Sequence, residues 1–366
     1  MSLVPKHIKA LKPYVAGKSK SEFNRKFKGI SPIKLASNEN PLGPSPKSIQ
    51  RVKSSLDSCN RYPDSSGFEL RKKLADKYSL NINNVIIGAG SEGIMSNIMR
   101  TFLHGSDQII SSMNSFIGFR VLADASGYET TWVPMKNYSY DLDAIADQIN
   151  KKTKIIYLAN PDNPTGTYFT KKEFDSFMKK VPNRVLIILD EAYYEYTEDI
   201  NDYPDSMLYR YDNIITLRTF SKAYGLAGFR VGYGFAHDDL ISNLMKVKLP
   251  FEPSILAQEA ALGALDDDKF LVNSIQLNLD QKYAMYDFFN SNGVKIIKSA
   301  TNFITILFTD ENSNDSFCNS LLEHGIIVRN LKAFGLPNCT RVTIGTEEEN
   351  EIFKQGFLKV IERVVV

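Results

Sequence analysis

Residues 213–236 read NIITLRTFSKAYGLAGFRVGYGFA, and this stretch decides the form of the predicted sheet. Two strand-like segments, NIITLRT (213–219) and VGYGFA (231–236), stand at its ends with only about eleven residues between them. A crossover between parallel strands takes a dozen or more residues, so this connection leaves little room for one. We therefore expect one antiparallel strand at this point of the sheet.

From about residue 84 the chain alternates short apolar runs with amphipathic segments. Two of the apolar runs, 154–159 and 184–190, are rich in Ile and Leu, which is typical of strands buried on both faces. Strands that alternate with helices predict an α/β fold, with a mostly parallel sheet covered by helices on both sides. The other predicted strands are 83–89 and 108–112, and the predicted helices are 91–103 and 119–126.

The pattern changes after residue 238. A long helical stretch covers roughly 238–291, with a break expected at LPFEPS (249–254). Short strands and helices follow, which is typical of a smaller α+β domain. The predicted strands there are 304–308 and 341–345, and the predicted helices are 315–324 and 347–363. We expect an N-terminal arm (1–40) that packs with the small domain, a large domain (41–250) and a small C-terminal domain (251–366).

The composition is that of an ordinary folded chain, with 43% hydrophobic and 23% charged residues among 366. This length suits two domains. Forty-four Lys and Arg against 42 Asp and Glu leave a net charge of +2, which predicts neither nucleic-acid nor membrane-surface binding. We see no long apolar run typical of a signal peptide or a membrane span, and we expect a cytoplasmic protein.

The cysteines and histidines give no sign of a disulfide or a metal site. The cysteines are odd in number and widely separated, which fits a reducing compartment. The histidines show no HExxH-like spacing, so we expect no bound metal. These residues are Cys59, Cys318, Cys339, His7, His104, His237 and His324.

Lys222 stands just past the end of the strand predicted at 213–219, where open α/β sheets place their ligand sites. Ser221 and Arg230, in the same segment, offer a hydroxyl and a guanidinium to an anion. A lone lysine after a strand is usually only a solvated side chain. The case for a catalytic Lys222 therefore depends on other segments.

The segment LDEAYYEY (189–196) is the first of these. Asp190 ends an almost wholly apolar strand, where an ionised carboxylate needs a positive partner. The protonated ring nitrogen of pyridoxal phosphate (PLP) is such a partner, because the carboxylate helps the ring to withdraw electrons from a carbanion. A helix N-cap is the alternative interpretation of Asp190. Tyr193 is placed either to reach the phenolic oxygen of the cofactor or merely to pack.

Two further segments follow predicted strands. In ANPDNPTG (159–166), steps before proline fix an irregular turn, so Asn163 has a defined direction and could donate to the cofactor's O3′, unless the segment is only a turn. GAGSEG (88–93) joins a strand to a helix, where glycines allow close backbone approach and a helix N-terminus binds phosphate. It is not a full GxGxxG motif, so a nucleotide site is poorly supported.

Two arginines of the predicted small domain, Arg329 and Arg341, lie at or beside short strands. The planar guanidinium suits bidentate binding of a carboxylate or a phosphate. Each could equally be a surface charge.

Taken in order, these segments resemble the fold-type I PLP-dependent aminotransferases, and within them the branch of histidinol-phosphate aminotransferases. SKAYGLAGFR after DEAY is highly specific for the superfamily. The likeness runs nearly end to end, through LKPY (11–14), ASNENPLGPSP (36–46), RYPD (61–64), GAGS (88–91), ANPDNPTG, LDEAYYEY, TFSKAYGLAGFRVGYG, IIVRNLKAFGLP and RVTIGTEEEN (341–350).

The resemblance implies a seven-stranded sheet and a role for each candidate residue. Lys222 would hold PLP as a Schiff base and move a proton between Cα and C4′, and Asp190 would pair with the ring nitrogen. Tyr62 would reach the cofactor of the neighbouring subunit, which implies a homodimer. The remaining roles are O3′ binding by Asn163 and Tyr193, phosphate binding by Gly90, Ser91, Ser221 and Arg230, ring stacking by Phe116, and substrate binding by Tyr14, Asn38, Arg329 and Arg341.

Two departures from the family pattern matter. Glu92 follows Ser91 at once, where the family commonly has its acidic residue one place later, and the stacking ring is Phe116 rather than a tyrosine. An aromatic amino-acid aminotransferase is the close alternative to histidinol-phosphate transamination, and an amino-acid-phosphate decarboxylase is a more distant one. A non-catalytic PLP-fold binding protein is the alternative from a different class.

Overall fold

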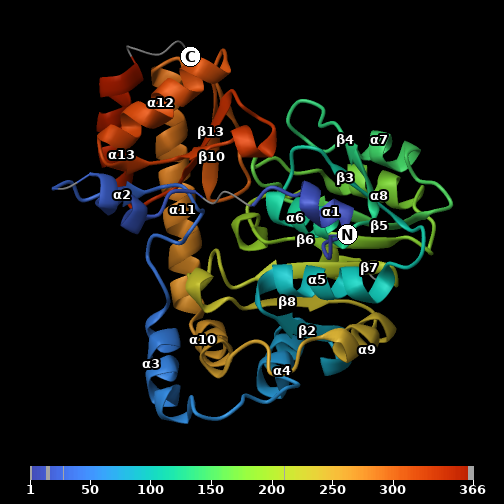
Figure 1. Ribbon diagram of the computed structural model, residues 1–366. Coiled ribbons are helices and arrows are strands. Elements are labelled where there is room, and N and C mark those ends of the chain that lie inside the picture. The colour runs from blue at the N-terminus through green and yellow to red at the C-terminus, as the bar shows by residue number, and fades with distance from the viewer. Residues whose placement is uncertain (1, 14–16, 28, 210, 362–366) are drawn as a thin grey trace.

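The computed structural model describes residues 2–13, 17–27, 29–209 and 211–361. A seven-stranded sheet lies at the centre of its larger part (Figure 1). The strands are β2 (Val85–Gly88), β3 (Gln108–Ser112), β4 (Glu129–Val133), β5 (Thr153–Ala159), β6 (Leu186–Asp190), β7 (Ile214–Thr219) and β8 (Gly232–Phe235). Their order is β2-β8-β7-β6-β5-β3-β4, and only β8 runs antiparallel to its neighbours. The prediction of a mostly parallel sheet with one antiparallel strand is confirmed.

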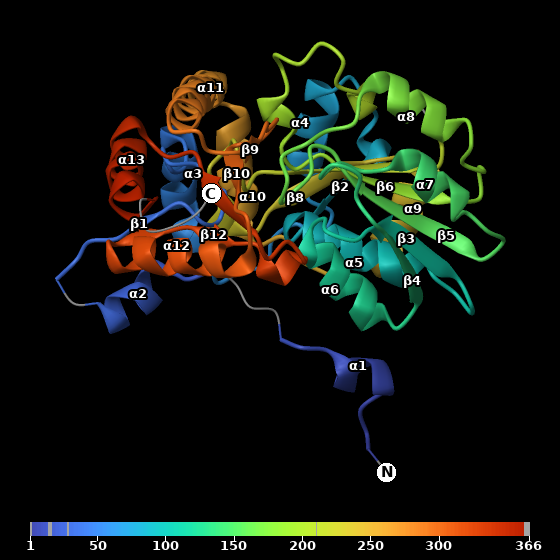
Figure 2. The same cartoon turned by 90° about the horizontal axis from the view of Figure 1, so that it is seen from above.

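Helices cover both faces of this sheet. They are α5 (Gly90–Phe102), α6 (Ile117–Ser126), α7 (Leu142–Asp147) and α8 (Lys171–Met178). Figure 2 shows α5 and α6 on one side and α8 on the other, as right-handed crossovers in opposite directions along the sheet require. Fully buried side chains such as Ile94 of α5 and Phe174 of α8 belong to one hydrophobic core with residues of β5 and β6. The helices predicted at 91–103 and 119–126 are confirmed as α5 and α6.

The helical stretch predicted at 238–291 is three helices, α9 (Asp238–Val247), α10 (Ile255–Leu265) and α11 (Asp268–Ser291). The expected break at 249–254 is confirmed. A second break, which the sequence analysis missed, falls at Asp266 and Asp267, where the Asp267 side chain accepts a hydrogen bond from the Phe270 backbone N–H at 3.4 Å. This aspartate begins α11 as an N-cap.

α10 packs against α3 (Pro46–Ser55) and α4 (Phe68–Lys77). Its apolar residues share a hydrophobic core with β2 and β8. The division of the chain at residue 250 stays a prediction, and the packing of α10 favours a boundary farther along the chain, in α11.

The C-terminal part contains the elements α12 (Glu311–Glu323), α13 (Glu347–Ile361), β9 (Ile296–Ile297), β10 (Phe303–Leu307), β11 (Ile326–Ile327), β12 (Arg329–Asn330) and β13 (Cys339–Thr343). β12, β13, β10 and β9 form an antiparallel sheet, which packs with α11, α12 and α13 around a second core. Both strands predicted in this part are present: 304–308 as β10 and 341–345 as β13. Both predicted helices are present too, 315–324 as α12 and 347–363 as α13. The ends of all four are shifted, and the comparison covers the described residues.

The N-terminal segment contains α1 (Lys6–Ala10), α2 (Lys20–Lys26) and β1 (Ile33–Lys34). β1 pairs in parallel with β11, whereas α1 contacts α6 beside the large sheet. Figure 2 shows the chain before α1 projecting away from the body of the molecule. Within the described ranges, no helix is both long and apolar enough to cross a membrane.

Candidate active site

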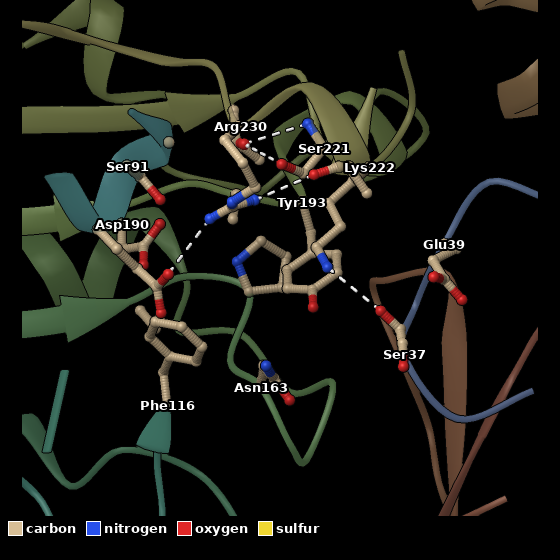
Figure 3. Close-up of a pocket in the computed structure, with 17 residues that line it drawn as sticks. Ser37, Glu39, Ser91, Phe116, Asn163, Asp190, Tyr193, Ser221, Lys222 and Arg230 are labelled. Carbon is tan, nitrogen blue, oxygen red and sulfur yellow. Dashed lines mark hydrogen bonds and ion pairs between the residues drawn. The ribbon is translucent and has the colours of Figure 1, made fainter. Parts of the chain in front are cut away.

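A cavity of about 280 Å³ lies where β2, β5, β6 and β7 meet the loops that follow or face them (Figure 3). The carboxyl ends of parallel strands collect ligand-binding loops at one edge of a sheet. The cavity therefore lies where the sequence predicted it. Nine predicted site residues line it: Gly90, Ser91, Phe116, Asn163, Asp190, Tyr193, Ser221, Lys222 and Arg230.

Lys222 follows β7 and extends its side chain into this cavity (Figure 3). Its Nζ donates to the backbone oxygen of Ser37 at 3.5 Å and lies 5.6 Å from the centre of the Tyr193 ring. Burial, together with the positive charge of Arg341, lowers the pKa of Lys222 to about 8. Near neutral pH a useful fraction of this amine is unprotonated and able to act as a nucleophile or a base.

Asp190 ends β6 and is buried at the floor of the cavity. Its Oδ2 accepts a hydrogen bond from the Tyr157 hydroxyl at 2.7 Å, while its Oδ1 is buried without a hydrogen-bond partner among the described residues. Burial raises the pKa of Asp190 to about 7, and the bond from Tyr157 opposes that rise. A cationic N–H donor in the cavity would satisfy Oδ1 and favour the ionised form.

An anion cradle lies at the start of α5. Ser91, Ser221 and Arg230 line it, and the Ser221 hydroxyl accepts a hydrogen bond from Thr219 at 3.0 Å. The φ of Gly90 is +74°, which favours glycine, and a Cβ there would lie 2.9 Å from Nη2 of Arg230, so that guanidinium would have to shift. Backbone N–H groups at a helix start, two hydroxyls and a guanidinium make a phosphate site.

Asn163, in the loop after β5, is connected to the small domain through Arg341. The Asn163 Oδ1 accepts a hydrogen bond from Nη1 of Arg341, whose Nη2 donates to the backbone oxygen of Ala36 at 3.0 Å. Asn38 in turn donates to the Tyr193 hydroxyl at 2.8 Å. Two of the four predicted substrate residues, Arg341 and Asn38, are therefore joined by hydrogen bonds to residues that line the cavity.

Arg329 and Arg341 occupy directly opposed positions on β12 and β13. Both are largely buried, and their guanidinium carbons lie 5.6 and 5.8 Å from the centre of the Phe334 ring. Two buried cations of like charge on neighbouring strands repel one another, so an anion held between or beside them relieves that cost.

Among the described residues, Asn38, Arg329, Arg341 and Tyr62 are predicted site residues that do not themselves line this cavity. Tyr62 is 79% exposed and stacks on Phe251, with ring centres 4.3 Å apart. Tyr14 lies outside the described residues. The exposed ring of Tyr62 is available for contact with another protein surface.

Eight lining residues were not among the predicted site residues: Ser37, Glu39, Glu92, Ala159, Pro161, Ala192, Thr219 and Ala227. Thr219 is the last residue of β7, so its position at the strand end was a usable signal. Ser37 and Glu39 flank Asn38 in a segment far from Lys222 in sequence, and only the folded chain brings them together. Glu39 also forms an ion pair with Lys34 at 2.8 Å.

These residues fit PLP. The unpartnered Asp190 Oδ1 suits a protonated ring nitrogen, the cradle at Gly90 suits a phosphate group, and Lys222 lines the same cavity with a lowered pKa. Phe116 begins α6 and lines the cavity, where an aromatic ring can stack on a pyridine.

Comparison with known proteins agrees with this chemistry. The family model described as "Aminotransferase class I and II" matches residues 30–356. A histidinol-phosphate aminotransferase 2 of Carboxydothermus hydrogenoformans is 39% identical over 98% of this chain and 99% of its own length. A histidinol-phosphate aminotransferase of Geobacillus sp. is 41% identical over 94% of each chain.

Among solved structures, histidinol-phosphate aminotransferase from Sinorhizobium meliloti, crystallised with pyridoxal-5′-phosphate, superposes with a TM-score of 0.91. It is 26% identical, and the match covers 99% of this chain and 98% of that one. The fold and the lysine-centred site define a PLP-dependent transaminase. The chain belongs to the aminotransferase class I and II family.

Proposed function

We propose that this protein transfers the amino group of histidinol phosphate to 2-oxoglutarate, forming imidazole acetol phosphate and glutamate. The observation that carries the proposal is the pair of opposed arginines, Arg329 and Arg341, joined through Asn163 to the Lys222 cavity. A substrate that carries a phosphate close to its reacting amine suits that arrangement. The curated relatives of that name span nearly the whole chain.

In this proposal Lys222 binds the cofactor covalently and later moves the proton. PLP supplies a carbon that accepts an amino group and a ring that takes up the electrons released from Cα. The lowered pKa of Lys222 makes its amine a general base once the amino substrate has displaced it. Because the amino group would stay with the bound cofactor after the first oxo product leaves and before the second oxo substrate binds, the reaction would show ping-pong kinetics.

The remaining lining residues hold and orient the cofactor. We assign Asp190 to the ring nitrogen, Asn163 and Tyr193 to O3′, and Phe116 to the ring face. Gly90, Ser91, Ser221 and Arg230 take the phosphate. The position of each at one cavity supports these roles.

The substrate's anionic end is assigned to Arg341, with Arg329 and Asn38 beside it. Arg341 is held by the backbone oxygen of Ala36 and by Asn163, so its guanidinium has a fixed direction. A fixed guanidinium binds an anion at a lower entropic cost than a mobile one. Tyr14 is proposed for the same end of the substrate.

We further propose a cytoplasmic homodimer in which the partner subunit's Tyr62 reaches the phosphate. The exposed ring of Tyr62 supports a contact with a second copy. The cysteines Cys59, Cys318 and Cys339 are all free, which suits a reducing compartment.

A visible absorption band on addition of PLP to the purified protein, and its loss in Lys222→Ala, test the cofactor assignment. The control is Lys34→Ala, which removes a lysine that pairs with the cavity residue Glu39 but does not itself line the cavity. We expect the band in the control and not in Lys222→Ala. If neither the unmutated protein nor Lys222→Ala shows the band with added PLP, the cofactor assignment fails. The alternative of a non-catalytic binding protein would then stand.

Steady-state assays with 2-oxoglutarate and either histidinol phosphate or phenylalanine test the substrate. We expect kcat/KM to favour histidinol phosphate by more than about tenfold, or about 1.4 kcal/mol of differential transition-state binding. A preference for phenylalanine would make the protein an aromatic amino-acid aminotransferase instead.

A further inference from the structure

Glu92 brings a negative charge to the cradle that is assigned to the cofactor's phosphate. Its Oε2 lies 3.3 Å from Nη2 of Arg230, and both side chains line the cavity. Among the described lining residues, Arg230 is the one guanidinium. The carboxylate therefore neutralises the principal cation of the cradle.

The neighbours of Glu92 leave room for its carboxylate at this place. A Cβ built on Gly118 would lie 2.5 Å from Oε1 of Glu92 and 2.5 Å from the ring of Phe116. Glycine at position 118 thus leaves the room that both side chains occupy. The carboxylate is also close enough to Asp190 for its charge to help raise the pKa of that residue.

The ion pair between Glu92 and Arg230 is half exposed, with 45% and 51% of the two side chains accessible. Such exposed pairs are weak, so a phosphate dianion can displace the carboxylate from the guanidinium. Once displaced, a carboxylate that stays nearby repels the phosphate. Glu92 thus opposes the phosphate both before and after binding.

We propose that Glu92 is an internal anion that competes with the cofactor's phosphate for Arg230 and so selectively weakens the binding of phosphorylated ligands. This inference rests on the proposed PLP site and concerns the affinity of the cofactor, not the reaction. The position of Glu92 directly after Ser91 would then have a physical consequence. Bound cofactor would exchange with free cofactor more readily than in a cradle without this carboxylate.

Equilibrium dialysis of PLP and of pyridoxal, which lacks the phosphate, tests the proposal. Both are measured with the Lys222→Ala protein, in which no covalent bond to the lysine contributes, with and without Glu92→Gln. We expect Glu92→Gln to increase the affinity for PLP about tenfold more than the affinity for pyridoxal, because any change at Asp190 affects the ring nitrogen of both ligands alike. Because the effect is electrostatic, it should shrink as the salt concentration rises from about 50 to about 500 mM.

Glu39→Gln is the matched control, because it removes the same charge from another wall of the cavity. We expect it to leave the ratio of the two dissociation constants close to that of the parent. Weaker PLP binding in Glu92→Gln would show that Glu92 positions Arg230, and equal changes for PLP and pyridoxal would show a structural role. Either result overturns the proposal while leaving the PLP site intact, whereas a parent protein that binds neither ligand overturns both.

Discussion

At the scale of single residues, Tyr157 sets the charge of Asp190. Its hydroxyl donates to Oδ2 at 2.7 Å and opposes the effect of burial on the carboxyl group. With both effects present, the pKa of Asp190 is raised to about 7. Tyr157→Phe should therefore raise the pKa of Asp190 further, by about one unit for the loss of one buried hydrogen bond. In a plot of PLP affinity against pH, the fall in affinity on the acidic side should move to higher pH by that amount.

The control for this prediction is Tyr140→Phe. Tyr140 is also buried and bonds to Ser115 and to the Ala159 backbone, but no hydrogen bond joins it to Asp190. PLP titrations between about pH 5 and 9 give the midpoint for each protein. An unmoved midpoint in Tyr157→Phe would contradict the assignment of Asp190 as the titrating group.

Glu195 gives a second prediction, on stability. Both of its carboxylate oxygens are buried without a hydrogen-bond partner among the described residues, and burial raises its pKa to about 7 from 4.5. The folded state therefore binds the proton more tightly than the unfolded state. The contribution of Glu195 to the free energy of unfolding is fully present below about pH 4.5 and is lost as the pH rises through 7.

Glu195→Gln should accordingly raise the free energy of unfolding at pH 8 by about 2 kcal/mol and change it much less at pH 5. Urea unfolding at the two pH values measures this difference. The exposed Glu69→Gln serves as the control, and we expect it to have no comparable pH-dependent effect. An equal effect of Glu195→Gln at both pH values would mean that the carboxylate does not titrate in this range.

Much of the candidate site was predictable at this scale, for a definite reason. Asp190 ends a strand, Asn163 and Lys222 each follow one, and parallel strands bring their carboxyl ends to one edge. The ion pair between Glu92 and Arg230 joins residues 138 positions apart and has no local signal. The pairing of an acidic side chain with a distant basic one depends on how the loops fold, so the sequence alone does not predict it.

At the scale of elements, α3 and α10 approach so closely that only glycine fits between them. A Cβ at Gly263 would lie 2.6 Å from Cα of Ser48, and the Ser48 hydroxyl donates to the Ala260 backbone at 2.8 Å. Gly263→Ala should force the helices apart and lower the free energy of unfolding by about 1–3 kcal/mol.

Denaturant unfolding of Gly263→Ala beside Gly228→Ala measures that cost. A Cβ at Gly228 meets nothing within 4 Å, so its replacement should be nearly neutral. If the two variants unfold alike, α3 and α10 are not in the close contact that the structure describes.

Elements buried on both faces were the easiest to predict, and those at an edge the hardest. β5 and β6 are continuous apolar runs because helices cover both sides of them. β4 (ETTWV) was missed because it is an edge strand with partly exposed side chains, so it lacks such a run. The second break in the long helical stretch depends on one capping aspartate, Asp267, which is a weak signal in sequence.

At the scale of the whole molecule, the cavity belongs to one chain but its proposed phosphate site is shared. Tyr62 lies outside its own cavity and is 79% exposed, so any role at a phosphate requires another copy. In a two-fold dimer, each subunit would give Tyr62 to its partner and receive the partner's Tyr62 in return. Two different inactive variants could then complement one another.

Lys222→Ala and Tyr62→Ala should each be inactive or nearly so alone, yet regain activity when unfolded together and refolded as a mixture. Random pairing makes about half of the dimers mixed, and each mixed dimer has one site with both residues intact. We therefore expect about one quarter of the activity of the unmutated protein. Sedimentation should show a dimer throughout. A mixture no more active than its components would mean that Tyr62 serves no partner, and the exposed ring would then need another explanation.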